Sequence, residues 1–289
     1  MGVLPWPFIG AEALAARAIP ERAMRDLYEP VFPGIYVPWG VSPSPRERAV
    51  AAWLWSRRRG TLAGRSAAAL HGAKWVDAAD PAELIHDNRR APSGISVWSD
   101  VLTPEEVVDI DGMGVTSPAR TAFDIGRHVA RRVAAVQRLD ALAAATDVKV
   151  TDVEAIMAAH PGARGTPRLR GALALMDGGA ESPQETAARL ALVDAGLPAP
   201  RTQIVVRNAY GDFIARIDMG YEDVKVGIEY DGPQHWTDPA VRQRDIDKQV
   251  ELADEKWRIV RVSRDLLYGR RATYVSRVMN ELRRRNFTW

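Results

Sequence analysis

The start of the chain alternates between helical and extended patterns. Apolar positions with helical spacing predict short helices over Ala11–Arg17 and Glu21–Leu27. The run Val31–Pro38 is rich in β-branched and aromatic residues and is broken by Pro33 and Gly34, which predicts two strands joined by a tight turn. Two small helices followed by a β-ribbon is the element order of a winged helix-turn-helix.

The middle of the chain is expected to form a mixed unit of helices and short strands. Apolar positions recur at helical spacing through Arg46–Arg58. Ser66 and Thr151 are candidate N-caps, for helices over Ala67–His71 and Thr151–His160. Further helices are expected over Ser117–Gly126 and Arg131–Ala145, and strands over Glu83–His86, Ile95–Trp98 and Val107–Ile110.

Two groups of chain-breaking residues separate this region from the rest. Pro161–Pro167 is the richest cluster of Pro and Gly, and Asp177–Gly179 is a second break. We place the domain boundary between them, near residues 165–180. The expected organisation is a winged-helix module over 1–80, a mixed α/β and helical connecting region over 81–175, and a further domain over 176–289.

The last third of the chain has the clearest pattern. A helix over Ser182–Ala195 ends at Gly196, a residue type typical of helix C-termini. Three strands, a helix, a strand and a final helix are expected after it, over Thr202–Arg207, Phe213–Met219, Lys225–Asp231, Pro239–Glu255, Trp257–Val262 and Leu266–Arg285. The expected fold class is therefore a two-domain protein of α+β and α/β character.

Acidic residues fall at related positions on two of these strands. Glu229 and Asp231 are two residues apart on one strand, so they point to the same face. A hairpin turn around Gly220–Asp223 brings Asp218 roughly opposite Glu229. Convergent carboxylates repel one another unless protons or a cation neutralise them. Oxygen ligands of this kind suit Mg²⁺ or Mn²⁺, which can polarise a phosphoryl oxygen and activate water.

Composition narrows the chemistry further. The chain has a formal net charge of +2 and a pI near 9.0. Its basic residues are mostly arginine, which suits phosphate recognition but is equally expected from a GC-rich genome. The absence of cysteine excludes disulfides, thiolate zinc sites and cysteine nucleophiles. No apolar run approaches the roughly 18 residues of a membrane span, and the first residues lack a basic leader, so a soluble cytoplasmic protein is expected.

The C-terminal pattern resembles a known group of nucleases. The element order and the Asp218…Glu229-x-Asp231 spacing resemble the PD-(D/E)XK superfamily, whose restriction-endonuclease-like core has the order αβββαβ. Ile228–Gly232 with His235 resembles the Vsr-like branch, related to very-short-patch-repair endonucleases. The resemblance extends to three further groups and covers about a hundred residues: Ser182-Pro183-x-Glu185, Asp245 with Lys248, and Trp257–Arg261.

The resemblance implies roles for individual residues. Asp218 and Glu229 would bind the metal, whereas Asp231 stands where many superfamily members carry a lysine. His235 would then supply a general acid or base. Candidates for the missing positive charge are Lys248, Arg244 and, more weakly, Gln234.

Structural explanations stand beside several of these roles. Glu185 follows Ser182 by three residues, and helix capping alone accounts for it. Asp231 before Gly232 is also a turn signal, and His235 is equally a surface loop residue. Asp245 and Lys248 have the spacing of a surface helix pair.

The N-terminal half resembles the AbiEi-type antitoxins of type IV toxin–antitoxin systems. Three segments carry this resemblance, over roughly the first 130 residues: Phe32–Val37, Ser66–Gly72 and Val115–Asp124. The resemblance implies a winged helix that binds DNA. Candidate phosphate contacts are the arginines of the second helix and of a basic triplet, namely Arg22, Arg25, Arg57, Arg58 and Arg59.

Other residues of this half have structural explanations. Ser117 caps a helix, Arg120 pairs with Asp124 at i, i+4 spacing, and His71 is structural. Two functions remain open for the whole chain. One is a Mg²⁺- or Mn²⁺-dependent DNA endonuclease, and the other is a DNA-binding antitoxin or regulator with an inactive nuclease-like domain. A cognate toxin or a repair protein is the expected partner besides DNA.

Overall fold

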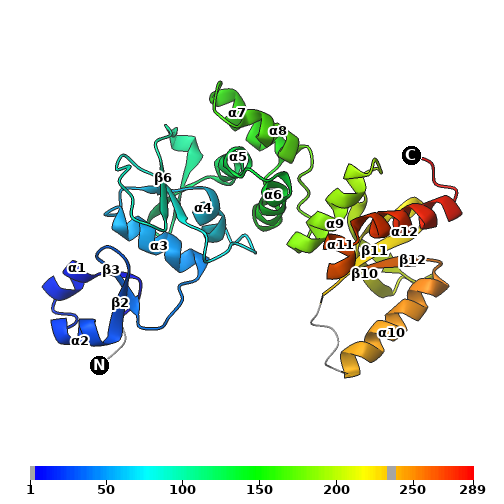
Figure 1. Ribbon diagram of the computed structural model, residues 1–289, viewed down its shortest axis with the longest axis horizontal. Coiled ribbons are helices and arrows are strands. Elements are labelled where there is room, and N and C mark those ends of the chain that lie inside the picture. The colour runs from blue at the N-terminus through cyan, green and yellow to red at the C-terminus, as the bar shows by residue number, and fades with distance from the viewer. Residues whose placement is uncertain (1–3, 233–238) are drawn as a thin grey trace. The chain divides into compact units, whose positions relative to one another are not determined.

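The computed structural model describes residues 4–232 and 239–289, the latter stretch with side chains from Gln243 onward. The chain forms two compact units, Met1–Met176 and Asp177–Trp289. This division falls inside the interval 165–180 marked by the chain breakers. Figure 1 shows helices and sheets in both units, which confirms a two-domain fold of mixed α and β structure.

The first unit begins with a small antiparallel sheet and two short helices. The sheet has the order β1-β3-β2, and the helices α1 and α2 lie between β1 and β2 in sequence. Gly34 has φ +78°, which fits the tight turn expected between β2 and β3. The bounds are β1 Phe8–Ile9, α1 Gly10–Ala15, α2 Glu21–Leu27, β2 Tyr28–Phe32 and β3 Ile35–Pro38.

A five-stranded mixed sheet follows, in the order β6-β5-β4-β8-β7. Its strands are β4 Thr61–Leu62, β5 Ala82–Ile85, β6 Ile95–Trp98, β7 Val107–Ile110 and β8 Met113–Thr116, with a 3₁₀ turn, η1, at Pro104–Glu106. Helices α3, Pro45–Trp55, and α4, Gly64–Leu70, pack on it. One buried core joins Phe32, Leu62, Leu84 and Val115. The expected boundary at 80/81 is therefore wrong, because it cuts through this core.

Two of the three expected N-caps of this unit, Ser66 and Thr151, are wrong. Helix α4 begins two residues before Ser66, whose buried hydroxyl instead accepts a hydrogen bond from the backbone N–H of Glu83 at 2.9 Å. Helix α7, Val150–Ala159, begins before Thr151. The carboxylate of Asp152 accepts a hydrogen bond from the N–H of Lys149 at 2.8 Å, so an acidic residue of the first turn caps this helix.

Helix α5, Pro118–His128, is the centre of the helical part of this unit. It contacts α6, Arg132–Thr146, as well as α7 and α8, Thr166–Leu173. Ser117 caps α5, and Arg120 Nε lies 3.1 Å from Asp124 Oδ2, as the spacing predicted. Arg120 also donates to Glu106, so these buried charges compensate one another.

The second unit contains a four-stranded sheet in the order β12-β11-β10-β9. Its elements are α9 Pro183–Asp194, β9 Arg201–Arg207, β10 Phe213–Tyr221, the 3₁₀ turn η2 Glu222–Val224, β11 Val226–Asp231, α10 Pro239–Asp254, β12 Arg258–Ser263, α11 Arg264–Tyr268 and α12 Arg271–Arg284. The expected order is present. The single helix expected over Leu266–Arg285 is two helices, because the chain breaks at Gly269 and Arg270.

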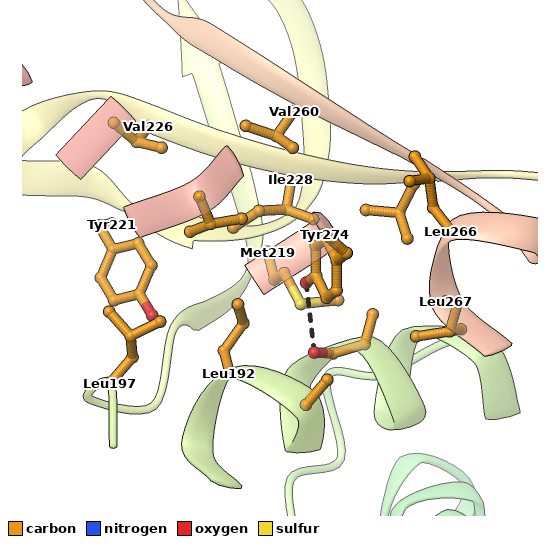
Figure 2. Close-up of a cluster of buried hydrophobic side chains, with 14 of the residues drawn as sticks. Leu192, Leu197, Met219, Tyr221, Val226, Ile228, Val260, Leu266, Leu267 and Tyr274 are labelled. Carbon is orange, nitrogen blue, oxygen red and sulfur yellow. Dashed lines mark hydrogen bonds between the residues drawn. The ribbon is translucent and has the colours of Figure 1, made fainter. Parts of the chain in front are cut away.

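Apolar side chains cover both faces of this sheet. One cluster joins Met219 and Ile228 of the sheet to Leu192 of α9 and Tyr274 of α12 (Figure 2). The Tyr274 hydroxyl donates to the carbonyl of Ala188 at 3.2 Å, which satisfies the polar end of a buried ring. In Figure 1 the sheet separates α9 and α12 from α10. A second, smaller cluster contains residues from α10 and the sheet, among them Ile204, Ile217, Leu252 and Trp257.

Among the described helices, none combines the length and apolar character that crossing a membrane requires.

Candidate functional site

The strands β10 and β11 separate at the position of the candidate acids. They pair antiparallel over three positions, ending at Met219 opposite Ile228. Beyond that pair, β10 continues along β9 and β11 continues along β12. Asp218 and Glu229 are the next residues on the two diverging strands. The backbone N–H of Tyr230 donates to Asp218 Oδ2 at 2.8 Å, so the Asp218 carboxyl lies inside this fork.

The environment of Asp218 is short of positive charge. Burial, together with the negative charges of Glu185 and Glu229, raises the pKa of its carboxyl to about 7. The Tyr230 N–H and the Lys248 ammonium act in the opposite direction without cancelling these effects. A cation that enters the fork would therefore stabilise the ionised form of this carboxyl.

Helix α10 brings a positive charge to the other acid. Lys248 Nζ lies 2.6 Å from Glu229 Oε1, and the Glu229 side chain is almost fully buried. Lys248 thus occupies a position from which it neutralises part of the acidic pair. Its helix neighbour Asp245, whose side chain is 40% exposed, pairs with Arg261 of β12.

Asp231 does not join the other two acids. Its carboxylate lies 3.6 Å from Arg261 Nη1, and Asp245 contacts the same guanidinium. Within residues 4–232 and 243–289, no group of three or more His, Asp or Glu side chains could hold a metal ion. The expected convergence of three carboxylates is therefore corrected to a pair, because Arg261 lies beside β11 and attracts Asp231.

Glu185 has a capping contact and a place beside the site. Its N–H donates to Ser182 Oγ at 3.2 Å, and its carboxylate accepts from the Glu181 N–H at 2.9 Å, as expected of a helix cap. Burial raises the pKa of Glu185, and its charge also acts on Asp218. The capping explanation therefore accounts for its local contacts but not for its position.

Gln203 of β9 was not singled out from the sequence. Its neighbours Thr202 and Ile204 pair with Met219 and Ile217, which puts Gln203 next to Asp218 in the sheet. Its side-chain Nε2 lies 3.4 Å from Glu185 Oε2. The signal in the sequence is weak, since a polar glutamine on a strand is common.

Three candidates of this domain remain, namely His235, Gln234 and Arg244. His235 and Gln234 lie outside the described residues, so their roles stay predictions. Arg244 is exposed on α10.

The chemistry of Asp218 and Glu229 fits a hard divalent cation. Mg²⁺ is commonly held by one or two carboxylates, with water and substrate phosphate completing an octahedral shell. The carboxylates of Asp218 and Glu229 supply such oxygen ligands, whereas the chain has no cysteine thiolate for a soft ion. Lys248 limits the negative charge of the pair without removing it.

The five candidate arginines of the first unit lie in different settings. Arg22 and Arg25 are exposed on α2, and Arg22 is 3.7 Å from Asp26. Arg58 forms a two-pronged pair with Glu12, with both contacts at 2.6 Å. Arg57 and Arg59 are exposed, and their guanidinium groups have no ion-pair partner within the part of the chain that the structure describes. These two are therefore the members of the triplet free to meet a phosphate.

Comparison with known proteins finds relatives without an assigned function. The chain is similar to two uncharacterized proteins, from two strains of Mycobacterium tuberculosis, with 31% identity over 177 residues. The match covers 60% of this chain and 65% of each relative, so it spans less than two thirds of their length. No family model matches the chain, and no solved structure matches it.

Proposed function

We propose that the second unit is a metal-dependent DNA endonuclease domain of the PD-(D/E)XK type, in its Vsr-like branch. The observation that carries this proposal is the position of Asp218 and Glu229 at the fork of β10 and β11, with Lys248 on Glu229. The element order of the unit and the raised pKa of Asp218 support it.

The proposed site divides the work among a few side chains. A bound Mg²⁺ or Mn²⁺ would supply Lewis-acid stabilisation of the phosphate and a water made more acidic. Asp218 and Glu229 bind and orient that ion through their carboxylate oxygens. Lys248 fixes the direction of Glu229 and offsets negative charge next to an approaching phosphodiester. The Tyr230 N–H holds Asp218 in place.

The first unit is proposed to bring this domain to DNA. Its two short helices and β2–β3 hairpin have the order expected of a winged helix, as in AbiEi-type antitoxins. Exposed Arg22 and Arg25 on α2, with Arg57 and Arg59 after α3, give this unit positive charge for phosphate contacts.

A second candidate function is DNA binding without cleavage, as in an antitoxin or transcriptional regulator. The observation in its favour is Asp231, which stands at the expected lysine position and pairs with Arg261. In that case the acidic pair would be a remnant, and a cognate toxin would be the natural partner.

One experiment separates the two functions. The purified chain is incubated with supercoiled plasmid and with matched and mismatched duplexes, in Mg²⁺, Mn²⁺ or EDTA, beside Asp218→Ala and Glu229→Ala. Cleavage that requires the metal and is lost in both variants supports the nuclease. Tight binding that EDTA does not change, with every substrate left intact, would support the regulator and overturn the nuclease.

A further inference from the structure

A basic groove runs along the outer edge of the sheet in the second unit. It has a volume of about 360 Å³ and lies between β12, the edge strand, and α12. Four arginines and one glutamate are the charged residues of its lining, which consists of Arg258, Ile259, Val260, Arg261, Arg277, Asn280, Glu281 and Arg284.

The helix α12 places its polar residues on one side of this groove. Arg277, Asn280, Glu281 and Arg284 have the i, i+3, i+4, i+7 spacing of a single helix face. Residues elsewhere around the helix, such as Val278 and Leu282, are buried in the core. The groove-facing row is therefore held rigidly by the same packing that stabilises the domain.

The charges of the groove are only partly neutralised within the chain. Glu281 lies 2.7 Å from Arg284 and 3.7 Å from Arg258, so one carboxylate serves two guanidinium groups. The guanidinium of Arg277 is exposed and forms no ion pair or hydrogen bond with any side chain that the structure describes. A polyanion entering here would meet unsatisfied donors in a fixed arrangement.

Arg261 belongs both to the lining of the groove and to the surroundings of the candidate acids. This arginine lines the groove and lies 3.6 Å from Asp231. In the parallel pairing of β11 with β12 it is the neighbour of Glu229. A phosphate chain lying in the groove is thereby directed towards the fork that holds Glu229 and Asp218.

We propose that this groove binds the phosphate backbone of a nucleic acid and leads it to the Asp218–Glu229 pair. The proposal rests on the nuclease function proposed above and adds its substrate path. Several guanidinium groups along one groove can contact several phosphates of a backbone, and each contact releases condensed counterions and makes the binding salt-dependent.

The chain contains no cysteine, so a single introduced thiol reports on one place. Asn280→Cys puts a thiol inside the groove, and Arg207→Cys puts one on β9, the opposite edge of the same sheet. Each variant, in the full chain with Asp218→Ala and in EDTA, meets a short duplex whose backbone carries a tethered mixed disulfide. The protein thiolate attacks this disulfide, forms a protein–DNA disulfide and releases the small thiol.

We expect cross-linking at residue 280 to be at least about tenfold faster than at residue 207. Adding Arg277→Glu and Arg284→Glu should bring the rate down to that of the control, whereas Arg277→Lys should retain most of it. Inorganic phosphate at matched ionic strength should leave the rate at residue 280 unchanged, because a single phosphate cannot span several arginines. Reaction of duplex that is held only by the first unit does not depend on the groove arginines, so the Arg→Glu changes separate it from groove binding.

Three results would overturn the proposal. They are equal rates at the two thiols, a rate insensitive to the Arg→Glu changes, and competition by inorganic phosphate, which would mean a simple anion site. If the arginines only prevent the edge strand β12 from pairing with another chain, the Arg→Glu variants would change self-association and not cross-linking. Because cleavage is absent from this assay, groove binding and the nuclease function fail independently.

Discussion

Lys248 and Glu229 form an ion pair of 2.6 Å between helix α10 and strand β11. They are 19 residues apart in sequence, and the pair forms because α10 contacts the sheet next to the fork. The lysine comes from a helix and not from the strand position that Asp231 occupies. The positive charge at the acidic pair is therefore supplied by helix α10 and not by strand β11.

Removing the Lys248 charge should impair cleavage more than folding. Lys248→Met leaves Glu229 facing the charges of Asp218 and Glu185, and we expect the cleavage rate to fall by about 10²–10³-fold. Lys248→Arg should recover part of the rate. Cleavage rates at saturating Mg²⁺ measure the effect, with Lys225→Met, an exposed lysine of the same domain, as the control. Equal rates for Lys248→Met and the wild type would remove Lys248 from the site.

The raised pKa of Asp218 predicts how stability depends on pH. The folded state holds the Asp218 proton up to about pH 7, whereas an ordinary aspartate with a pKa of 3.8 loses it earlier. The unfolded chain thus binds fewer protons between about pH 4 and pH 7, so this group makes stability fall as pH rises through that window. Above about pH 7 the contribution of Asp218 to stability is fully lost.

Asp218→Asn removes this dependence while keeping an acceptor for the Tyr230 N–H. Thermal melts in EDTA should show the variant equal to the wild type near pH 4 and more stable at pH 8. The difference should grow between these values. A constant difference across the whole range would mean that Asp218 titrates as an ordinary carboxyl.

A metal bound to the acidic pair should stabilise the folded chain. At a concentration one hundred times its Kd, Mg²⁺ would add about 2.7 kcal/mol to the free energy of unfolding. The wild type should therefore melt at a higher temperature in Mg²⁺ than in EDTA at pH 8, whereas Asp218→Asn and Glu229→Gln should not. An equal shift in these variants would place the ion elsewhere.

The sequence predicted the second unit better than the first. Long amphipathic helices and alternating strands carry strong periodic signals, and the elements from α9 to β12 match their expected positions within a few residues. The strands β1, β4 and β8 were missed, because β1 and β4 have two residues each, β8 contains Gly114, and such strands are defined by their partners. The start of α4 was misplaced because a tertiary contact with Glu83 occupies the Ser66 hydroxyl. The start of α7 was misplaced because Asp152, and not Thr151, accepts the local capping hydrogen bond.

The same limit applies to the candidate site. The opposition of Asp218 and Glu229 follows from strand pairing across one short hairpin, which spacing alone predicts. The pairing of Asp231 with Arg261 depends on the parallel strand β12, which follows β11 only after helix α10. No local sequence pattern predicts this pairing. The contribution of Glu185 to the charge around Asp218 was likewise hidden behind its capping role.

The arginine triplet of the first unit should contribute unequally to DNA binding. Arg57→Ser with Arg59→Ser should weaken binding to all sequences alike and lower the salt slope by about 2, because each phosphate contact contributes about 1. Arg58→Ser should change the slope less, since Glu12 already occupies its guanidinium. Fluorescence anisotropy over a series of KCl concentrations tests this, and equal effects of the three arginines would contradict it.

The buried ion network around Arg120 should be essential for stability. Arg120→Met leaves the carboxylates of Asp124 and Glu106 buried without their main partner, and we expect a loss of about 3–5 kcal/mol. Arg22→Met, at an exposed position, should change stability by less than about 0.5 kcal/mol. Urea unfolding of both variants measures the difference, and similar midpoints would show that the network adds little.

The central claim is that Asp218 and Glu229 hold a divalent ion and that the domain uses this ion to cleave nucleic acid. The most direct measurement is the rate of plasmid cleavage against Mg²⁺ concentration, for the wild type, Asp218→Asn and Glu229→Gln. We predict saturable cleavage by the wild type, abolished by EDTA, and a loss of at least about 10²-fold in both variants. Cleavage that persists in both variants, or a wild type that never cuts at any Mg²⁺ concentration, would contradict the claim.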